Sequence, residues 1–440
     1  MAAAVLLQAI FNSLPGSKGV TMHLKIYKLF ILIVWVTIAI PAIGYAQLTL
    51  DGQYRPRTEI RDGYQILSSS EDKPAFFTSQ RTRLALTYEQ QKYRFKISGQ
   101  DVRTWGEVGQ LDDTPSVNIY EAWAQLMIAE EWTLQLGRQE LVYDDQRLLG
   151  SVNWAQQGRT HDAIRIKYRN RSAGFMADIG GAYNQEGQKL LGNHYALDNY
   201  KVLSYLWIKK TVGSLTGSAI LLTDGFEISS GAVNYRYTYG GNLNYLASPL
   251  KLSGTVYLQQ GDDRMRRNIS AYMLGGKASY NIGNWLLTGG YDYLSGGKFD
   301  DQNSGRHAFN TLYATGHKFN GHMDYFTNIP ADTRGGGLQD WYFKAGYELN
   351  NKANANLTYH HFSLAHSVAN PLESNSPLGR NLASELDFSL TYSFSEEITF
   401  RAGYSILFED ETLELIQERQ ADGAQQWGWA MLVLSPKIIN

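Results

Sequence analysis

The chain contains no cysteine, has almost no net charge and has only one long apolar run. Its 440 residues include 40 Lys and Arg against 42 Asp and Glu, which gives a formal net charge of −2. The absence of cysteine excludes a disulfide framework and thiol catalysis. The balanced charge gives no indication of a nucleic-acid partner. Aromatic residues reach 13% although the mean hydropathy is −0.33, which is typical of strands with one polar and one apolar face.

The one long apolar run lies near the N-terminus and is too short to span a bilayer as a helix. It covers Leu29–Ile40, follows two lysines and is followed by a small-residue cleavage motif that ends at Ala46. This arrangement predicts a secretory signal peptide, with Met22 as the true start of translation. We therefore expect a leader over residues 1–46 and a single mature domain over 47–440.

Most of the mature chain alternates polar and apolar residues. Residues 164–169, for example, read Ile, Arg, Ile, Lys, Tyr, Arg, and residues 385–394 alternate in the same way. Successive side chains of a strand point to opposite faces, so each segment has one apolar and one polar face. The predicted strands are Leu48–Arg57, Arg81–Tyr88, Tyr93–Gln100, Ile119–Ile128, Trp132–Gly137, Ala163–Arg169, Gly174–Tyr183, Tyr200–Lys209, Ser214–Leu222, Val233–Gly240, Lys251–Gln259, Ser270–Tyr280, Trp285–Tyr293, Asp340–Leu349, Ala355–Phe362, Ser384–Phe394, Ile398–Phe408 and Gln426–Leu434.

The connections between these strands alternate short with long. Glu89–Lys92 and Ser395–Glu397 are short, whereas Arg138–Asp162 and Leu294–Gln339 are long. Bacterial outer-membrane barrels have short periplasmic turns and long outer loops, and a soluble barrel has no reason to sort its loops in this way. The sequence therefore predicts an all-β fold, a transmembrane antiparallel β-barrel of about 18 strands. It would lie in the outer membrane of a Gram-negative bacterium with both termini in the periplasm.

Several strands place basic residues on the side expected to face the barrel interior. One interpretation of these basic residues is a hydrated pore lining of mixed charge. The other is a positively charged path along which a polyanion passes. The acidic residues lie mostly on later strands, which predicts a transverse field across the lumen. The predicted substrate-binding residues on the strands are Arg81, Arg83, Arg94, Lys96, Arg165, Lys167 and Arg169.

The most distinctive segment runs from Gly137 to Thr160. It contains Gly-Arg-Gln at 137–139, Arg-Leu-Leu-Gly at 147–150, then Trp154, and Gly-Arg-Thr at 158–160. This pattern resembles the alginate-export family of outer-membrane barrels. The likeness extends through Tyr291–Gly296 and Asn310–Phe326, and so covers the mature chain.

The resemblance implies diffusion of an anionic uronate polymer through an arginine-lined constriction. By motif position, the pore arginines would be Arg138, Arg147 and Arg159. Guanidinium suits this role because its planar fork binds carboxylates with two hydrogen bonds.

The predicted loop Arg138–Asp162 is too apolar for a solvated loop tip, since it carries Leu148, Leu149 and Trp154. We expect it to fold into the barrel, because barrels of this width leave a channel unless something narrows it. The alternative is an outer loop whose arginines form ordinary ion pairs with Glu140, Asp144 or Asp145.

Signals for an enzyme or a metal site are weak. No nucleophile elbow, phosphate loop or His-Glu-x-x-His pattern is present. Three histidines, His360, His361 and His366, lie near one long loop and three more, His307, His317 and His322, lie on another, with spacings that match no known metal site. Ser363 near His361 is the only candidate for a lipase at the barrel rim. Paired acids at Asp144-Asp145 and Asp300-Asp301 are more often solvated than bound to calcium.

The sequence thus predicts a non-enzymatic porin, without cofactor or metal, for passive passage of an anionic oligo- or polysaccharide such as an alginate-like uronate. A general or carboxylate-selective porin and a non-conducting display or adhesion barrel are the alternatives. Expected partners are the anionic saccharide, outer-membrane lipid and periplasmic secretion proteins, and no nucleic acid is expected.

Overall fold

A computed structural model describes residues 47–195, 199–228, 231–300, 306–373 and 375–439, so the predicted leader lies outside the described residues. The strands are β1 (Gln47–Asp62), β2 (Ala75–Glu89), β3 (Tyr93–Thr104), β4 (Asn118–Ala129), β5 (Trp132–Gln139), β6 (His161–Asn170), β7 (Phe175–Tyr183), β8 (Val202–Val212), β9 (Leu215–Glu227), β10 (Val233–Ala247), β11 (Leu250–Asp262), β12 (Asn268–Ile282), β13 (Trp285–Leu294), β14 (Leu338–Asn350), β15 (Ala353–Leu364), β16 (Asn381–Ser393), β17 (Ile398–Glu409), β18 (Gln425–Leu434) and β19 (Lys437–Ile439).

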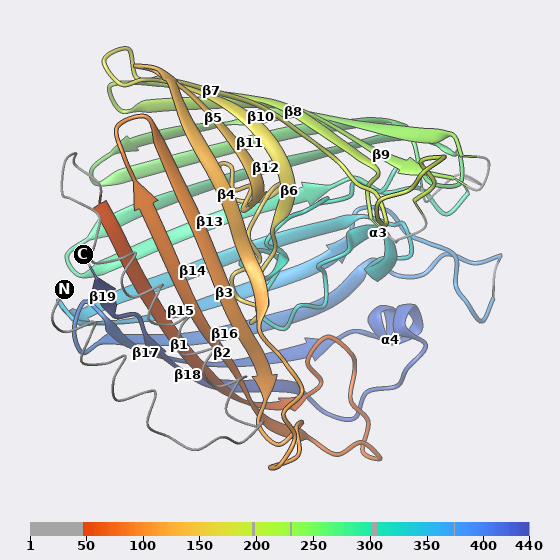
Figure 1. Cartoon of the computed structure of the whole chain (residues 1–440). Helices are drawn as coiled ribbons and strands as arrows, with labels where there is room; N and C mark the ends of the chain where they lie inside the picture. Colours follow the sequence, from red (N-terminus) through yellow and green to blue (C-terminus); the bar gives the residue numbers. More distant parts are fainter. Residues whose placement is uncertain (1–46, 196–198, 229–230, 301–305, 374, 440) are drawn as a thin grey trace, which may run out of the picture. The chain divides into compact units, whose positions relative to one another are not determined.

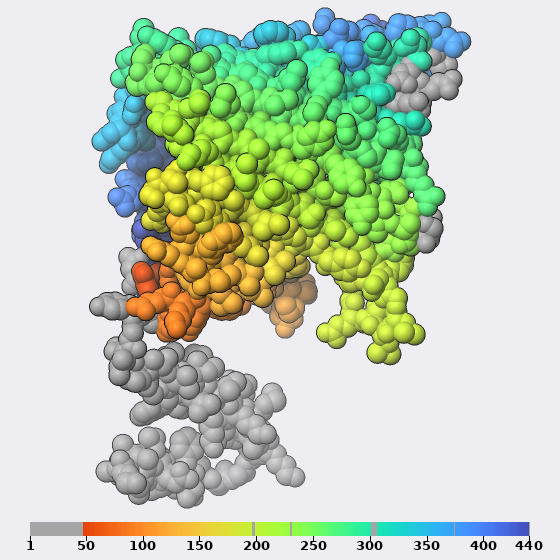
Figure 2. All heavy atoms as spheres, turned by 90° about the horizontal axis from the view of Figure 1, so that it is seen from above, coloured from red at the N-terminus to blue at the C-terminus, as the bar shows by residue number. Residues whose placement is uncertain are grey.

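The strands form one closed antiparallel barrel (Figure 1). Each strand pairs with the next along the chain, and β18 returns to pair with β1 from Tyr54↔Leu434 to Asp62↔Gln426. The short β19 follows a break at Ser435 and Pro436 and continues the ladder along β1. The barrel wall therefore consists of 18 strands, and the predicted fold is confirmed. Figure 2 shows consecutive strands forming a continuous wall, with colours that pass from orange through green to cyan.

Every predicted strand is present, and several are longer than predicted at their long-loop ends. β1 continues to Asp62 and β2 begins at Ala75, because the two strands keep pairing as far as Arg61↔Ala75. The alternation of apolar residues fades in this part of the strands, where cross-strand pairing alone maintains the ladder.

Short helices interrupt the predicted loops. They are η2 (Gly316–Lys318), α3 (Ile329–Asp332) and α4 (Glu411–Gln417). Both α-helices lie at the end of the barrel opposite β19 (Figure 1). No helix among the described ranges is long and apolar enough to cross a membrane.

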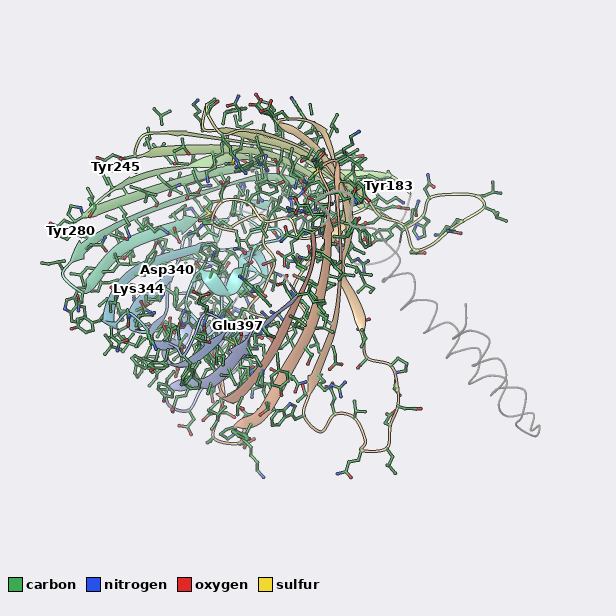
Figure 3. The ribbon with its side chains drawn as sticks, turned by 60° about the vertical axis from the view of Figure 1, so that its left-hand side comes forward. Tyr183, Tyr245, Tyr280, Asp340, Lys344 and Glu397 are labelled. Atoms are coloured by element: carbon green, nitrogen blue, oxygen red, sulfur yellow. The ribbon has the colours of Figure 1, made fainter. Side chains whose placement is uncertain are left out.

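The outer face of the barrel carries the exposed apolar side chains. On β5, for example, Trp132 and Leu136 are exposed whereas Gln135 is buried inside. Exposed tyrosines lie towards both ends of the strands: Tyr245 and Tyr280 at one end and Tyr183 at the other (Figure 3). Aromatic girdles flanking an apolar band are typical of barrels in outer membranes.

Candidate pore constriction

Two long loops fold into the barrel and pack against each other. They are the β5–β6 loop, residues 140–160, and the β13–β14 loop, residues 295–337, of which 301–305 lie outside the description. Leu149 forms a bridge with Tyr313, and the Gly150 amide donates to the Tyr313 carbonyl at 2.9 Å. The inward folding expected for Arg138–Asp162 is therefore observed for residues 140–160, while the residues at its two ends belong to β5 and β6. We call these two segments the inner loop pair.

Guanidinium groups of β1 and β2 attach the β5–β6 loop to one side of the wall. Arg55 donates to the side chain of Gln156 at 2.8 Å, and Arg57 donates to the Trp154 carbonyl at 2.8 Å. Arg81 donates to the Gln156 carbonyl at 3.1 Å and is 0% exposed. Arg81 was expected to bind a solute from its inward position, but in the structure the loop covers it. Its role there is to hold the loop.

Arg147 attaches the same loop to the opposite side of the wall. Its guanidinium donates to Asp292 of β13 at 2.8 Å, contacts Asp145 at 3.3 Å, and lies over the Phe319 ring at 4.1 Å. Only 7% of Arg147 is exposed. The residue lies inside the barrel, as its motif position suggests, but its charge is already paired. Of the alternative interpretation, the contact with Asp145 is observed, whereas the outer position of the loop is not, and the main partner is Asp292.

The other two motif arginines lie in different surroundings. Arg159 donates to the Ala314 carbonyl at 3.0 Å, forms no ion pair with a described residue, and lines a cavity of about 740 Å³ between β1–β3 and the inner loop pair. Arg138 forms an exposed ion pair with Asp162 at 2.8 Å. It occupies the same side of β5 as the exposed Leu136, which is the outer side. The structure therefore does not place Arg138 in the lumen, because its parity along the strand is that of the outward row.

The strand cations on β2, β3 and β6 fall into two groups. The first group is paired with acids: Arg94 with Glu89, Lys96 with Glu121 and Arg169 with Asp178. The second group bonds only neutral partners. Arg83 donates to Gln100 at 2.7 Å, Arg165 to Gln135 at 3.2 Å, and Lys167 to Gln135 at 2.6 Å and Gln125 at 2.9 Å. This second group presents unpaired positive charge to the lumen.

Most acids of the later strands are buried and bonded to other groups, whereas Glu348 of β14 is exposed and forms no ion pair with a described residue. Asp224 pairs with Arg236 at 2.6 Å, and Asp340 pairs with His360 at 2.9 Å. Glu385 accepts the backbone amide of Met323, from the β13–β14 loop, at 2.8 Å. These carboxylates hold the barrel interior together and do not face open lumen. Burial of these groups reduces the acidic side of the transverse field predicted from the sequence, in which Glu348 remains exposed.

Sequence reasoning missed several inward cations. Arg55 and Arg57 alternate with outward residues of β1, so the period of two was a sufficient signal. Lys277 of β12 and Lys344 of β14 follow the same rule. Lys318 lies on η2 and had no such signal, because the position of a loop residue depends on tertiary packing. Burial lowers the pKa of Lys318 below its ordinary value.

The histidines and acid pairs show no metal site within the described residues. His317 stacks on Trp154 with ring centroids 4.2 Å apart and lies 2.9 Å from Asp324. The Nδ1 atom of His361 is 3.2 Å from the hydroxyl of Ser384 rather than that of Ser363. In the described part of the chain no carboxylate contacts His361. Asp301 of the second acid pair lies outside that part.

The comparisons with known proteins agree with this architecture. Residues 46–190 match the model of the alginate export family. OccAB4 from Acinetobacter baumannii superposes with a TM-score of 0.62 at 11% identity, over 91% of this chain and 100% of that chain. OprD from Pseudomonas aeruginosa superposes with a TM-score of 0.60 at 14% identity, over 89% of this chain and 96% of that chain. A comparison with curated proteins gives no match.

The family match is shorter than the resemblance predicted from the sequence, since it ends before Tyr291–Gly296 and Asn310–Phe326. The solved structures are too distant in sequence to show more than the fold. Residues 46–190 thus carry the alginate export pattern, on a barrel with the fold of the outer-membrane porins.

Proposed function

We propose that the protein is an outer-membrane channel that passes anionic saccharides, with an alginate-like uronate chain as its substrate. The observation that carries this proposal is the imbalance of available charge in the lumen. Arg83, Arg159, Arg165 and Lys167 form no ion pair with a described carboxylate, whereas the carboxylates of Asp292 and its neighbours are buried and paired. Glu348 of β14 is an exposed exception among the later-strand acids, and on the side of the barrel formed by β2–β6 the charge available to a passing solute is positive.

The chemistry of these groups suits carboxylates. Guanidinium and ammonium groups bond carboxylate oxygens with charge-assisted hydrogen bonds, which are about twice as strong as neutral ones. A low-dielectric wall focuses their field on the lumen and raises the local concentration of anions. The exposed apolar outer face suits outer-membrane lipid as the surrounding partner.

A carboxylate-selective porin for small solutes would use the same cations. It differs in the length dependence of block, because a small acid occupies one cation whereas a uronate chain spans several. A display barrel differs from both because it conducts no ions.

Conductance in planar bilayers tests the proposal. Changing Arg165 and Lys167 together to Gln should lower anion preference and weaken block by uronate oligomers. The barrel should stay folded, because neither side chain forms an ion pair with a described carboxylate and glutamine keeps hydrogen-bonding capacity at both positions. Wild-type block should strengthen with oligomer length.

The matched control is Arg138→Gln with Asp162→Asn. This pair removes charges from the outer face of the neighbouring strands and should leave reversal potential and block unchanged. An unchanged reversal potential in the inner variant, or wild-type block that is independent of oligomer length, would refute the proposal.

A further inference from the structure

Three lysines converge on one cavity at the wall opposite the β3–β6 cations. The cavity, about 310 Å³, is lined by Lys277 of β12, Lys344 of β14 and Lys318 of η2. None of the three forms an ion pair with a described carboxylate. The acids that border the cavity, Asp292 and Asp340, are paired with other groups, Arg147 and His360. Figure 3 shows Asp340 and Lys344 in the barrel interior. The cavity therefore holds uncompensated positive charge.

An asparagine-rich cavity of about 430 Å³ opens at the short-turn end of the same wall. The asparagines that line it come from the ends of β12 and β14, the two turns that follow these strands, and the start of β15. They are Asn281, Asn284, Asn350, Asn351, Asn354 and Asn356. One acid and one base, Glu348 and Lys352, line the same cavity. The side-chain amides of Asn281, Asn284 and Asn351 form no hydrogen bond with any described residue. We call this group the asparagine cluster.

Turn chemistry explains only part of the asparagine cluster. Asparagine is common in turns, and the Asn350 side chain accepts the Lys352 amide at 2.9 Å in the expected way. Asn356, however, lies beyond the turn on β15. Gly346 faces it, and a Cβ at that glycine would come within 2.9 Å of the Asn356 oxygen. The glycine at 346 thus leaves space for the side-chain amide of Asn356, and the geometry of the turn does not require an asparagine at that position.

The lysine cavity and the asparagine cluster adjoin, since Leu286 lines both. Lys277 and Asn281 are four residues apart on β12, which corresponds to about 13 Å along the strand. A small dicarboxylic acid cannot reach from one to the other. A saccharide chain of a few units can, with a carboxylate at one position and hydroxyls at the other.

We propose that this wall is a linear subsite for an acidic saccharide, in which the lysine cavity binds a sugar carboxylate and the asparagine cluster binds the hydroxyls of adjoining units. Ammonium groups supply donors to the carboxylate. Amides both donate and accept, as hydroxyls do, so they match a polyhydroxylated ligand and not a bare acid. The subsite rests on the proposed function and makes its substrate class specific: a chain with carboxylates and hydroxyls, not a small acid.

Calorimetric titration of the full-length barrel tests the subsite. The protein is kept in amine-oxide micelles, because a sugar-headed detergent would compete. The probes are a uronate oligomer and succinate. Asn354→Ala with Asn356→Ala should weaken uronate binding about tenfold and leave succinate binding unchanged. Lys277→Gln with Lys344→Gln should weaken both. The control, Lys210→Gln on the outward row of β8, should change neither.

Circular dichroism and heat-dependent gel migration establish that each variant is folded. Unchanged uronate affinity in the folded asparagine variant, or an equal loss for succinate, overturns the subsite. Channel block then separates the two proposals. If the asparagine variant binds uronate as tightly as wild type but uronate still blocks the channel, the subsite is wrong and the proposed function stands. If no uronate oligomer blocks the wild-type channel, both the subsite and the proposed function are wrong.

Discussion

At the scale of single residues, an inward cation either holds the protein together or remains available to a solute. Arg147 and Arg81 belong to the first kind, because each is buried and bonded to groups from another part of the chain. Lys167 belongs to the second, because its partners are glutamine amides that leave its charge uncompensated. The distinction depends on partners and not on residue type.

Arg147→Ala should therefore destabilise the protein rather than simply weaken block. It leaves Asp292 buried without its partner, which costs about 3–5 kcal/mol. Heat-dependent gel migration should show a lower transition temperature, and single-channel records should show more current noise. Adding Asp292→Asn should restore much of the loss. An unchanged transition in the single variant would contradict the anchoring role.

Lys318 predicts a pH dependence of anion binding. Burial lowers its pKa most, Asp145 opposes the shift in part, and the nearby Lys277 and Arg147 add to it. A bound carboxylate favours the protonated ammonium and raises that pKa, so binding takes up protons and should weaken as pH rises from neutral to alkaline. Titration of the uronate oligomer at several pH values measures this slope. Lys318→Gln should reduce it, and an identical slope in that variant would contradict the assignment.

At the scale of elements, the inner loop pair determines how wide the lumen is. The β5–β6 loop is bonded to β1 and β2 on one side and to β13 on the other, so it crosses the interior instead of extending from the rim. Its carbonyls also cover guanidinium groups that would otherwise face solvent. The loop therefore controls both the space and the charge of the channel.

Deleting residues 144–157 should raise conductance and also raise anion preference. The deletion removes the loop acceptors of Arg55, Arg57 and Arg81 and uncovers their guanidinium groups. Arg57 keeps its ion pair with Glu59, so the gain in available charge comes from Arg55 and Arg81. Single-channel conductance and reversal potential measure the two effects. Deleting residues 109–113, which are exposed in the β3–β4 loop, is the control and should change neither. If the two deletion variants had the same conductance and the same reversal potential, the constriction would lie outside residues 144–157.

At the scale of the whole barrel, closure removes the free strand edges that open sheets expose. The described chain should give a strand-dominated circular dichroism spectrum and should migrate differently in detergent gels before and after boiling. Folding depends on a complete ladder, since β1 pairs with β2 on one side and with β18 and β19 on the other. A largely helical spectrum, or recovery in the soluble fraction, would contradict this.

The sequence by itself determined the strands, their order and the alternation of turns and loops, because a period of two is a local property of the chain. The sequence also indicated that Arg138 faces outward, because it alternates along β5 in step with the apolar residues Leu134 and Leu136. The motif position, in contrast, suggested the pore. Only the tertiary structure decided which inward charges are available. Arg147 meets Asp292 and Arg55 meets Gln156 across 145 and 101 residues of sequence, and no local pattern records such pairings.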